Sequence, residues 1–453
     1  MSEGSLRDAP LAPGGGSLRA ALAFRRDPLA FLAGAAEACG DSFRFRATRR
    51  VWVYVLRSPA AIHHVLVEHP ERYTKRSRGY MKLREFLGDG LLTAEGEHWR
   101  RQRRIAQPAF HRERIAGFAG TMVTLTEAML GRWEALAASG AVVDVDHEMT
   151  RLTLAIAGKT LLSADVDGDA DVVSRSVAAL NTWASVSMLR VLHPPLWVPT
   201  PLNRRASAGK RALDAIVYGM IARRRETGED PGDLLSMLMH AVDEETGEGM
   251  SDQQLRDEVM TIFLAGHETT ANALSWALYL LSRHPEVARR VGEELGRVLG
   301  GRSPTVEDLP ALELTERVFL ETLRLFPPAW MVGRYLAEDD AADGVRLCAP
   351  AMVLVSPWLT HRDPKWWPNP EGFDPDRFLP EAARARPRHA FIPFGGGPRI
   401  CIGNAFAMME AKLLLATILQ RFRPALVPGH PVAPEPLITL RPRHGLRMTI
   451  ARA

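Results

Sequence analysis

The sequence predicts a mainly α-helical protein with a minor β-sheet region. Apolar residues recur at helical spacing in many runs, and one run, residues 251–284, is longer than a typical globular helix. Strict alternation of apolar and polar residues, which is typical of strands, is clear over residues 43–57. The 453 residues are 46% hydrophobic and 24% charged, which excludes disordered and fibrous classes.

From the N-terminus onward, the chain begins with a segment that we expect to be loose. Residues 11–16 read Leu-Ala-Pro-Gly-Gly-Gly, a composition that cannot bury enough apolar surface to become ordered. We therefore predict a flexible tail over residues 1–20. No Pro/Gly/Ser-rich linker divides the remainder, so residues 21–453 are expected to form a single domain.

The strand pair at 43–57 is followed by segments that are almost all helical. Ser251 and Gln254 form a capping-box pattern at the start of the long helix, and Pro285 ends it. At a rise of 1.5 Å per residue, this helix would span roughly 45 Å. The other predicted helices are 98–118, 121–138, 147–163, 171–190, 205–225, 284–299, 311–325 and 404–421.

Composition also limits the compartment and the partners. No run approaches the roughly 18 consecutive apolar residues of a membrane span, and no secretory signal begins the chain. Cys39, Cys348 and Cys401 are odd in number and far apart, which suits a reducing compartment rather than a disulfide framework. We therefore expect a cytoplasmic protein. A net charge of +4 implies no general attraction to nucleic acid.

A lone cysteine follows a glycine-rich loop and precedes a predicted helix. The fixed positions of this segment are Phe394, Gly397, Arg399, Cys401 and Gly403. A cysteine near a helix N-terminus is favoured as the thiolate, the form that binds metals. Glycines let the backbone approach a flat ligand closely. A phosphate-binding loop is excluded because no Lys-Ser/Thr pair follows the glycines.

This pattern resembles the haem-binding signature of the cytochrome P450 family. The resemblance implies the family fold, with its long central helix over the haem, and haem b with Cys401 as the iron ligand. It also implies O2 as substrate and electrons derived from NAD(P)H. A thiolate ligand pushes electron density onto iron and favours O–O cleavage. Cys39 and Cys348 are more simply explained as small apolar residues.

Other family motifs occur in the expected order. Glu321 and Arg324 resemble the family's Glu-x-x-Arg pair, and Arg377 resembles the arginine that completes a structural Glu-Arg-Arg network. Within the long helix, residues 265–270 resemble the oxygen-activation motif. There the resemblance assigns Thr269 to guiding protons during oxygen activation, with Glu268 as its acidic partner. A polar face on a buried helix is the simpler alternative.

Residues near Glu268 and Thr269 bear on the function of this motif. Ala265 and Gly266 are small and leave room for the haem. A zinc-protease motif built on His267 and Glu268 is excluded, because its second histidine would have to stand at Ala271.

Haem propionates need cations, and the resemblance supplies candidates. Trp99, Arg100 and Arg103 match the family's Trp-(Arg/Lys)-x-x-Arg helix, and Arg334 and Arg399 are further candidates by position. For Arg101 and Arg104 a solvated basic face is the preferred interpretation. Such a face could steer an acidic electron donor.

The function implied is insertion of one oxygen atom from O2 into a hydrophobic small molecule. A terpenoid or fatty-acyl substrate is favoured, with a steroid or macrolide as alternatives. Only a short segment follows Cys401, so electrons are expected from a separate ferredoxin or flavodoxin with its reductase, and a monomer is expected. By analogy with the family, the substrate pocket is lined by Phe86, Leu92, Leu196, Trp197, Phe263, Ala265, Trp330, Met331, Val332 and Ile438.

Three alternatives remain beside the monooxygenase. A peroxide-driven peroxygenase or an isomerase could use the same fold, although such relatives usually replace the acid–alcohol pair that this chain keeps at Glu268 and Thr269. A non-catalytic haem sensor would consume no NADPH with any substrate.

Overall fold

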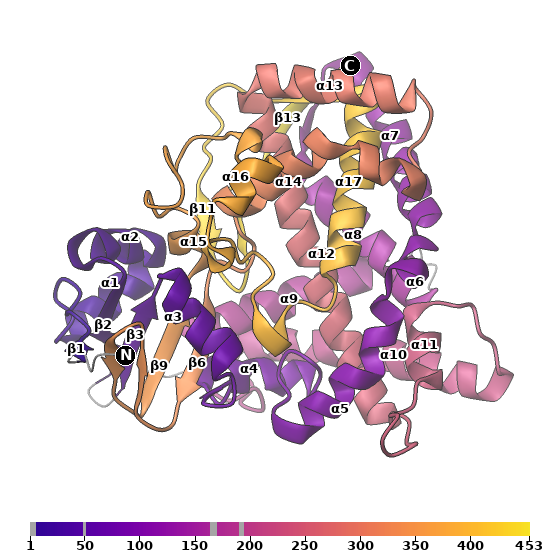
Figure 1. Ribbon diagram of the computed structural model, residues 1–453. Coiled ribbons are helices and arrows are strands. Elements are labelled where there is room, and N and C mark those ends of the chain that lie inside the picture. Colours follow the sequence, from indigo (N-terminus) through magenta and orange to yellow (C-terminus); the bar gives the residue numbers. More distant parts are fainter. Residues whose placement is uncertain (1–5, 49–50, 164–169, 190–193) are drawn as a thin grey trace. The chain divides into compact units, whose positions relative to one another are not determined.

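The computed structural model describes residues 6–48, 51–163, 170–189 and 194–453, and it is mainly helical with small sheets (Figure 1). The predicted fold class is confirmed. The sequence predicts one domain, whereas the chain groups into two compact units. The first unit comprises Met1–Tyr80 and Leu320–Cys401, and the second comprises Met81–Phe319 and Ile402–Ala453.

The first unit is built on a mixed sheet with the strand order β2-β3-β9-β6-β4. The predicted strand pair is present as antiparallel β2 (Ser42–Arg46) and β3 (Trp52–Leu56), and β3 pairs in parallel with β9 (Ala351–Val355). Their apolar residues form the core of the unit. The remaining strands of this sheet are β4 (Tyr73–Thr74) and β6 (Val332–Leu336), and a second sheet holds β1 (Arg7–Asp8), β8 (Val345–Leu347) and β7 (Asp340–Ala342).

The N-terminal segment differs from the predicted flexible tail. Residues 1–5 lie outside the described residues, but β1 pairs with β8, and Ala9 and Ala12 are buried. A helix, α1, already begins at Leu18. Composition does not reveal that this segment is ordered, because its order depends on two small side chains, Ala9 and Ala12, that pack into the first unit. The glycines at 14–16 form only the turn between these residues and α1.

Short helices complete the first unit. Several begin with a proline in the first turn, where its missing N–H leaves no hydrogen bond unmade. The helical segments are α1 (Leu18–Arg26), α2 (Pro28–Cys39), α3 (Pro59–His63), the π-helical turn η1 (His64–Glu68), α15 (Pro357–Thr360), η4 (Pro375–Phe378), α16 (Pro380–Arg384), η5 (Arg388–Ala390) and η6 (Gly397–Arg399).

The long helix of the sequence is α12 (Asp252–Arg283), with 32 residues in the second unit. Its capping box is formed as predicted, since Ser251 N donates to Gln254 Oε1 at 2.8 Å and Gln254 N donates to Ser251 Oγ at 3.3 Å. Most of its side chains are buried because α8 (Val145–Leu162), α10 (Pro201–Thr227) and α17 (Asn404–Arg421) pack against it.

The predicted helices of the second unit are largely present, with one clear break. The run at 98–118 is divided into α5 (Gly96–Ala106), η2 (Gln107–Phe110) and α6 (Arg112–Ala116), because Pro108 lacks the N–H that would continue α5. Position 190 of the predicted run 171–190 lies outside the described residues. The other helices are α4 (Arg78–Leu87), α7 (Ala119–Ser139), α9 (Ala170–Leu189), α11 (Leu234–His240), α13 (Pro285–Leu299), η3 (Val306–Ala311) and α14 (Glu313–Leu325), which ends in the first unit.

Two small sheets belong to the second unit. The first has the order β10-β13-β5 and the second pairs β11 with β12. Their strands are β5 (Val142–Asp144), β10 (Phe422–Leu426), β11 (Pro434–Pro436), β12 (Leu440–Pro442) and β13 (Arg447–Arg452). Within the described part of the chain, no helix is both long and apolar enough to cross a membrane.

Candidate functional site

Cys401 ends a tight loop that begins at Phe394. The Cys401 N–H donates to the Phe394 carbonyl at 2.9 Å, and the Ile400 N–H donates to the Gly397 carbonyl at 3.1 Å. Gly397 has a φ of +66°, and a Cβ there would lie 1.8 Å from the carbonyl oxygen of Leu66. Only glycine fits that position. Cys401 itself is exposed, so its Sγ can reach a ligand.

The same unit holds two of the predicted propionate cations. Arg334 on β6 is only 7% exposed, and its Nη1 donates to the Gly333 carbonyl at 2.9 Å. Among the described residues, no carboxylate forms an ion pair with this guanidinium. A buried cation of this kind is unfavourable unless an anion pairs with it. Arg399 is half-buried in the cysteine loop. An accessible thiol and a buried cation that lacks a carboxylate fit an iron-bearing, dianionic group such as haem.

The predicted Glu-Arg-Arg residues lie together. Arg324 is fully buried; its Nε donates to Glu321 Oε2 and its Nη2 to Glu321 Oε1, both at 2.7 Å. Arg377 Nε lies 3.4 Å from Glu321 Oε1. Arg324 Nη1 also donates to the His361 carbonyl at 3.0 Å, and its guanidinium lies 5.3 Å from the ring centroid of Trp367. The network therefore joins α14 to the segment that leads to the cysteine loop.

In the second unit, α12 is open on one side at its middle. Ala265 is exposed while Leu264 is buried, and Thr269 is half-buried one turn later. Thr269 Oγ1 donates to the Ala265 carbonyl at 2.8 Å, which leaves the lone pairs of this hydroxyl available to accept. His267 lies on the buried side, where burial lowers its pKa and Nδ1 lies 2.9 Å from the Phe263 carbonyl. The histidine is therefore a neutral core residue.

Glu268 is held by residues that the sequence did not single out. Asn181 Nδ2 on α9 donates to Oε2 and Thr439 Oγ1 donates to Oε1, both at 2.8 Å. Asn272 Nδ2 donates in turn to Thr439 Oγ1 at 3.0 Å. Asn181 and Thr439 are too distant from Glu268 along the chain for any motif to link them. They fix the carboxylate as an acceptor on both of its oxygens.

The predicted haem-facing helix is α5. Trp99 and Arg103 are half-buried, and Arg103 Nε donates to Gln107 Oε1 at 3.3 Å. Arg100 is exposed and forms a short ion pair with Glu97, one turn earlier. Arg100 would have to leave Glu97 before it could pair with any other anion.

The expected solvated basic face on α5 is not present. Arg101 Nη2 lies 3.3 Å from Glu248 Oε2, and Arg104 Nη2 lies 3.1 Å from Asp243 Oδ2 and 2.9 Å from Glu245 Oε2. The prediction was wrong because the segment 243–248 folds its acidic residues onto the helix. Arg101 and Arg104 are neutralised, so they offer little net charge to an acidic electron donor.

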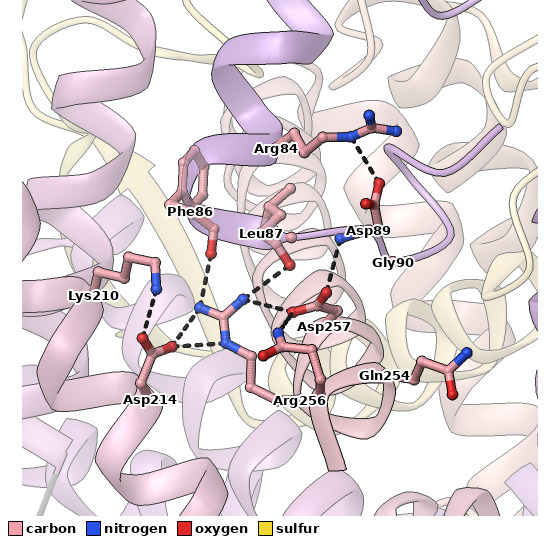
Figure 2. A network of polar contacts seen from close by, with 12 residues as sticks. Arg84, Phe86, Leu87, Asp89, Gly90, Lys210, Asp214, Gln254, Arg256 and Asp257 are labelled. Atoms are coloured by element: carbon pink, nitrogen blue, oxygen red, sulfur yellow. Dashed lines mark hydrogen bonds and ion pairs between the residues drawn. The ribbon is translucent and has the colours of Figure 1, made fainter. Parts of the chain in front are cut away.

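The C-terminal end of α4 is attached to α12 by a buried arginine (Figure 2). Arg256 Nη1 donates to the Leu87 carbonyl at 3.1 Å and Nη2 to the Phe86 carbonyl at 2.8 Å, so the guanidinium caps the end of α4. Its Nε donates to Asp214 Oδ1 at 2.7 Å. Phe86, predicted to line the substrate pocket, is thereby fixed in the interior.

Two carboxyl groups of α12 continue this attachment. Asp257 Oδ2 accepts from Asp89 N at 2.9 Å (Figure 2), and Glu258 Oε2 accepts from Leu91 N at 3.1 Å. Glu258 Oε1 is buried and has no hydrogen-bond partner among the described residues. Burial, together with the nearby Asp257, raises the pKa of Glu258 to about 8, although the bond from Leu91 acts in the opposite direction.

This shift predicts a pH-dependent stability. A carboxyl group with a raised folded pKa binds its proton more tightly in the folded state, so it favours folding at low pH. That contribution is lost as pH rises from about 4.5 to about 8. Glu258→Gln removes the titration and is expected to gain stability over the wild type by at most about 1.4 kcal/mol per pH unit in this window.

Urea unfolding followed by circular dichroism at pH 5, 6, 7 and 8 measures this difference. Glu229→Gln, which changes an exposed glutamate, is the control and should leave the difference flat across the series. A flat difference for Glu258→Gln would contradict the burial argument.

The residues predicted to line the pocket fall into three groups. Phe86, Phe263 and Trp330 are buried, and Phe86 packs edge-on against Trp183 with ring centroids 6.1 Å apart. Trp197 is 82% exposed, so the structure does not place it in a pocket. Ala265 is exposed, and the remaining members are half-buried: Leu92, Leu196, Met331, Val332 and Ile438.

Comparison with known proteins supplies the family. The cytochrome P450 family model matches residues 20–446. Cyclooctatin synthase of Streptomyces melanosporofaciens is 41% identical over 95% of this chain and 93% of its own length. Pentalenene oxygenase of Streptomyces avermitilis is 35% identical over 94% of this chain and 93% of its own length.

A solved structure agrees. The crystal structure of the cytochrome P450DA heme domain superposes with a TM-score of 0.90 at 29% identity, over 99% of both chains. Haem b is therefore the cofactor of this fold, and O2 and NAD(P)H-derived electrons are its co-reactants. This chain belongs to the cytochrome P450 family and is a monooxygenase of that family.

Proposed function

We propose that this chain oxygenates a terpenoid compound with electrons from a separate ferredoxin or flavodoxin. The observation that carries the oxygenase assignment is the Glu268 carboxylate, held on both oxygens directly before Thr269. A proton supply of this kind is needed when O2 is the oxidant. Peroxide already carries its protons, and a sensor performs no proton-consuming reaction, so neither alternative needs Glu268 fixed in this way.

The residue roles follow from the motifs. When bound, haem b supplies O2 activation at a thiolate-ligated iron. We assign Cys401 as the iron ligand, within a loop in which Phe394, Gly397 and Gly403 allow close approach. Cationic and polar contacts to the propionates are assigned to Arg334, Arg399, Trp99, Arg100 and Arg103, and Glu321, Arg324 and Arg377 are assigned to holding the fold behind the loop.

Proton delivery is assigned to the acid–alcohol pair. Thr439 and Asn181 both donate to Glu268, so the carboxylate is held as an acceptor that can take up a proton and pass it on. Thr269 donates to the Ala265 carbonyl and therefore offers its lone pairs to the next proton donor. Ala265, which ends at Cβ, leaves space beside this hydroxyl.

The terpenoid assignment rests on two relatives and on apolar side chains. The names of cyclooctatin synthase and pentalenene oxygenase refer to terpenoid products or substrates. The residues assigned to the pocket are largely apolar, which suits a hydrocarbon skeleton rather than a charged substrate. Because the family match runs over residues 20–446 without a break, we propose that residues 21–453 act as one catalytic domain, as a monomer.

The test is turnover by the purified haem-loaded protein with surrogate ferredoxin, ferredoxin reductase and NADPH. A panel of cyclic diterpene and sesquiterpene hydrocarbons and alcohols is compared with fatty acids, and products are identified by mass spectrometry under ¹⁸O2. We expect one labelled oxygen atom in a terpenoid product. Oxygenation of fatty acids alone would overturn the substrate class. Product formation with hydrogen peroxide but not with NADPH and O2 would support the peroxygenase instead.

Glu268→Gln is expected to lower the rate of product formation by about 10²-fold, because the amide cannot take up and release a proton as the acid does. Substrate binding, measured by the spin-state shift of the haem, should remain unchanged. Thr439→Val removes one of the two donors to Glu268 and is expected to give a smaller loss. Wild-type turnover by Glu268→Gln would remove Glu268 from the relay.

A further inference from the structure

A cluster of imidazole and carboxylate groups lies on the π-helical turn of the first unit, outside the haem residues. The turn η1 is closed by a hydrogen bond from His69 N to the His64 carbonyl at 3.0 Å, an i→i+5 bond. This winding returns His69 beside His64, with ring centroids 4.6 Å apart. π-Helical turns often occur at functional sites.

The His64 ring is oriented by a buried carboxylate. Its Nε2 lies 3.0 Å from Asp340 Oδ2, which also accepts from Tyr73 Oη at 2.7 Å. Arg72 Nη1 donates to the other oxygen, Oδ1, at 2.9 Å. Asp340 acts only as an acceptor, so His64 Nε2 donates to it, and Nδ1 is the ring nitrogen that remains to bind a metal when the ring is neutral. A histidine held by a carboxylate in this way is the usual second-shell arrangement of metal sites.

His64 Nδ1 lies near a second candidate ligand. Glu68 Oε2 lies 3.5 Å from it, and the other oxygen of Glu68 lies 3.0 Å from His63 Nδ1. Ligand atoms of a tetrahedral zinc ion, each about 2.1 Å from the metal, lie about 3.5 Å apart. One ligand atom each from His64, Glu68 and His69 all lie within 4.8 Å of one another. His69 Nδ1 also lies 3.5 Å from Glu71 Oε1, a contact that metal binding through this nitrogen would replace.

We propose that His64, Glu68 and His69 bind a divalent transition-metal ion of the zinc class. Two imidazoles and one carboxylate suit Zn²⁺, whereas Mg²⁺ and Ca²⁺ prefer oxygen ligands alone. Glu68 is exposed and the two histidines are half-buried, so an ion can enter from solvent. The ion would brace the turn whose Leu66 carbonyl lies against Gly397 of the cysteine loop.

The test uses Zn²⁺ alone as the probe, on the full haem-loaded chain. Dialysis against micromolar Zn²⁺ with metal analysis, together with titration calorimetry, is expected to give one Zn²⁺ per wild-type chain. His64→Ala, Glu68→Gln and His69→Ala should each lose this ion. The Glu68 side chain is 49% exposed, so Glu68→Gln disturbs no core packing and tests the site even if a histidine variant unfolds.

His284→Ala is the matched control and should keep the ion. His284 also faces a carboxylate, with Nδ1 3.4 Å from Glu286 Oε1, but it lies outside the cluster. Asp340→Asn is expected to weaken Zn²⁺ binding by about 10–100-fold through the loss of the second-shell carboxylate. A wild type that retains no Zn²⁺, or ligand variants that all retain it equally, overturns the proposal.

Discussion

Replacement of Cys401 by serine is expected to reduce product formation to background and to remove the strongly red-shifted Soret band of the reduced, carbon monoxide-bound protein. The band reports a thiolate bound to haem iron, and a serine hydroxyl cannot supply the electron density that favours O–O cleavage. The loop should still fold in Cys401→Ser, because its hydrogen bond to Phe394 comes from the backbone N–H. The loss would therefore arise from the sulfur atom itself.

The other two cysteines serve as matched controls for this experiment. Cys39 is half-buried, its Sγ lies 3.4 Å from the Leu11 carbonyl, and burial raises the pKa of its thiol, which disfavours the metal-binding thiolate. Cys348 is half-buried as well. Cys39→Ser and Cys348→Ser should keep both the band and the activity. A band that survives in Cys401→Ser but disappears in either control would reassign the ligand.

The sequence predicts those parts of the site whose residues are close together both along the chain and in space. The cysteine loop spans ten positions, and Glu321 and Arg324 stand one helical turn apart, so a local pattern captures each of them. Asn181 and Thr439 contact Glu268 from α9 and from the turn between β11 and β12. No local rule connects such positions, so the partners that hold Glu268 become visible only in the structure.

The features of the fold that the sequence did not predict also depend on patterns that are too short or on residues far apart in the sequence. Strands such as β10 and β12 are short and contain proline or arginine. The alternation of apolar and polar residues in them is too short to predict a strand. The basic face of α5 was predicted from charge within one helix, but the acids that neutralise it lie at 243–248. The long helix α12 was predicted closely because its cap, periodicity and terminating proline all act locally.

Arg324→Ala is expected to destabilise the protein by about 3–5 kcal/mol, because the buried Glu321 carboxylate loses its two hydrogen bonds from Arg324 and keeps only the longer contact with Arg377 as an ion pair. The change also removes donors from the carbonyls of His361 at 3.0 Å, Pro370 at 2.6 Å and Gly372 at 2.8 Å. Each buried carbonyl left unpaired adds to the loss. His361 does not substitute as a cation, since its burial, with Arg362 nearby, still lowers its pKa when Arg324 is removed.

Urea unfolding and the ratio of haem to protein after purification measure this loss. Arg324→Lys keeps the charge but cannot reproduce the two parallel bonds to Glu321, so it should fall between the wild type and Arg324→Ala. Arg384→Ala is the control, because Arg384 is exposed and, among the residues that the structure describes, bonds only within α16, to the Pro380 carbonyl at 3.1 Å. Its effect should stay within about 0.5 kcal/mol. Because Arg324 contacts the carbonyls of the segment that leads to the cysteine loop, lower haem retention should accompany the lower stability. If Arg324→Ala is strongly destabilised but retains all of its haem, the Glu321–Arg324–Arg377 network does not support the cysteine loop. The network would then stabilise only the rest of the first unit.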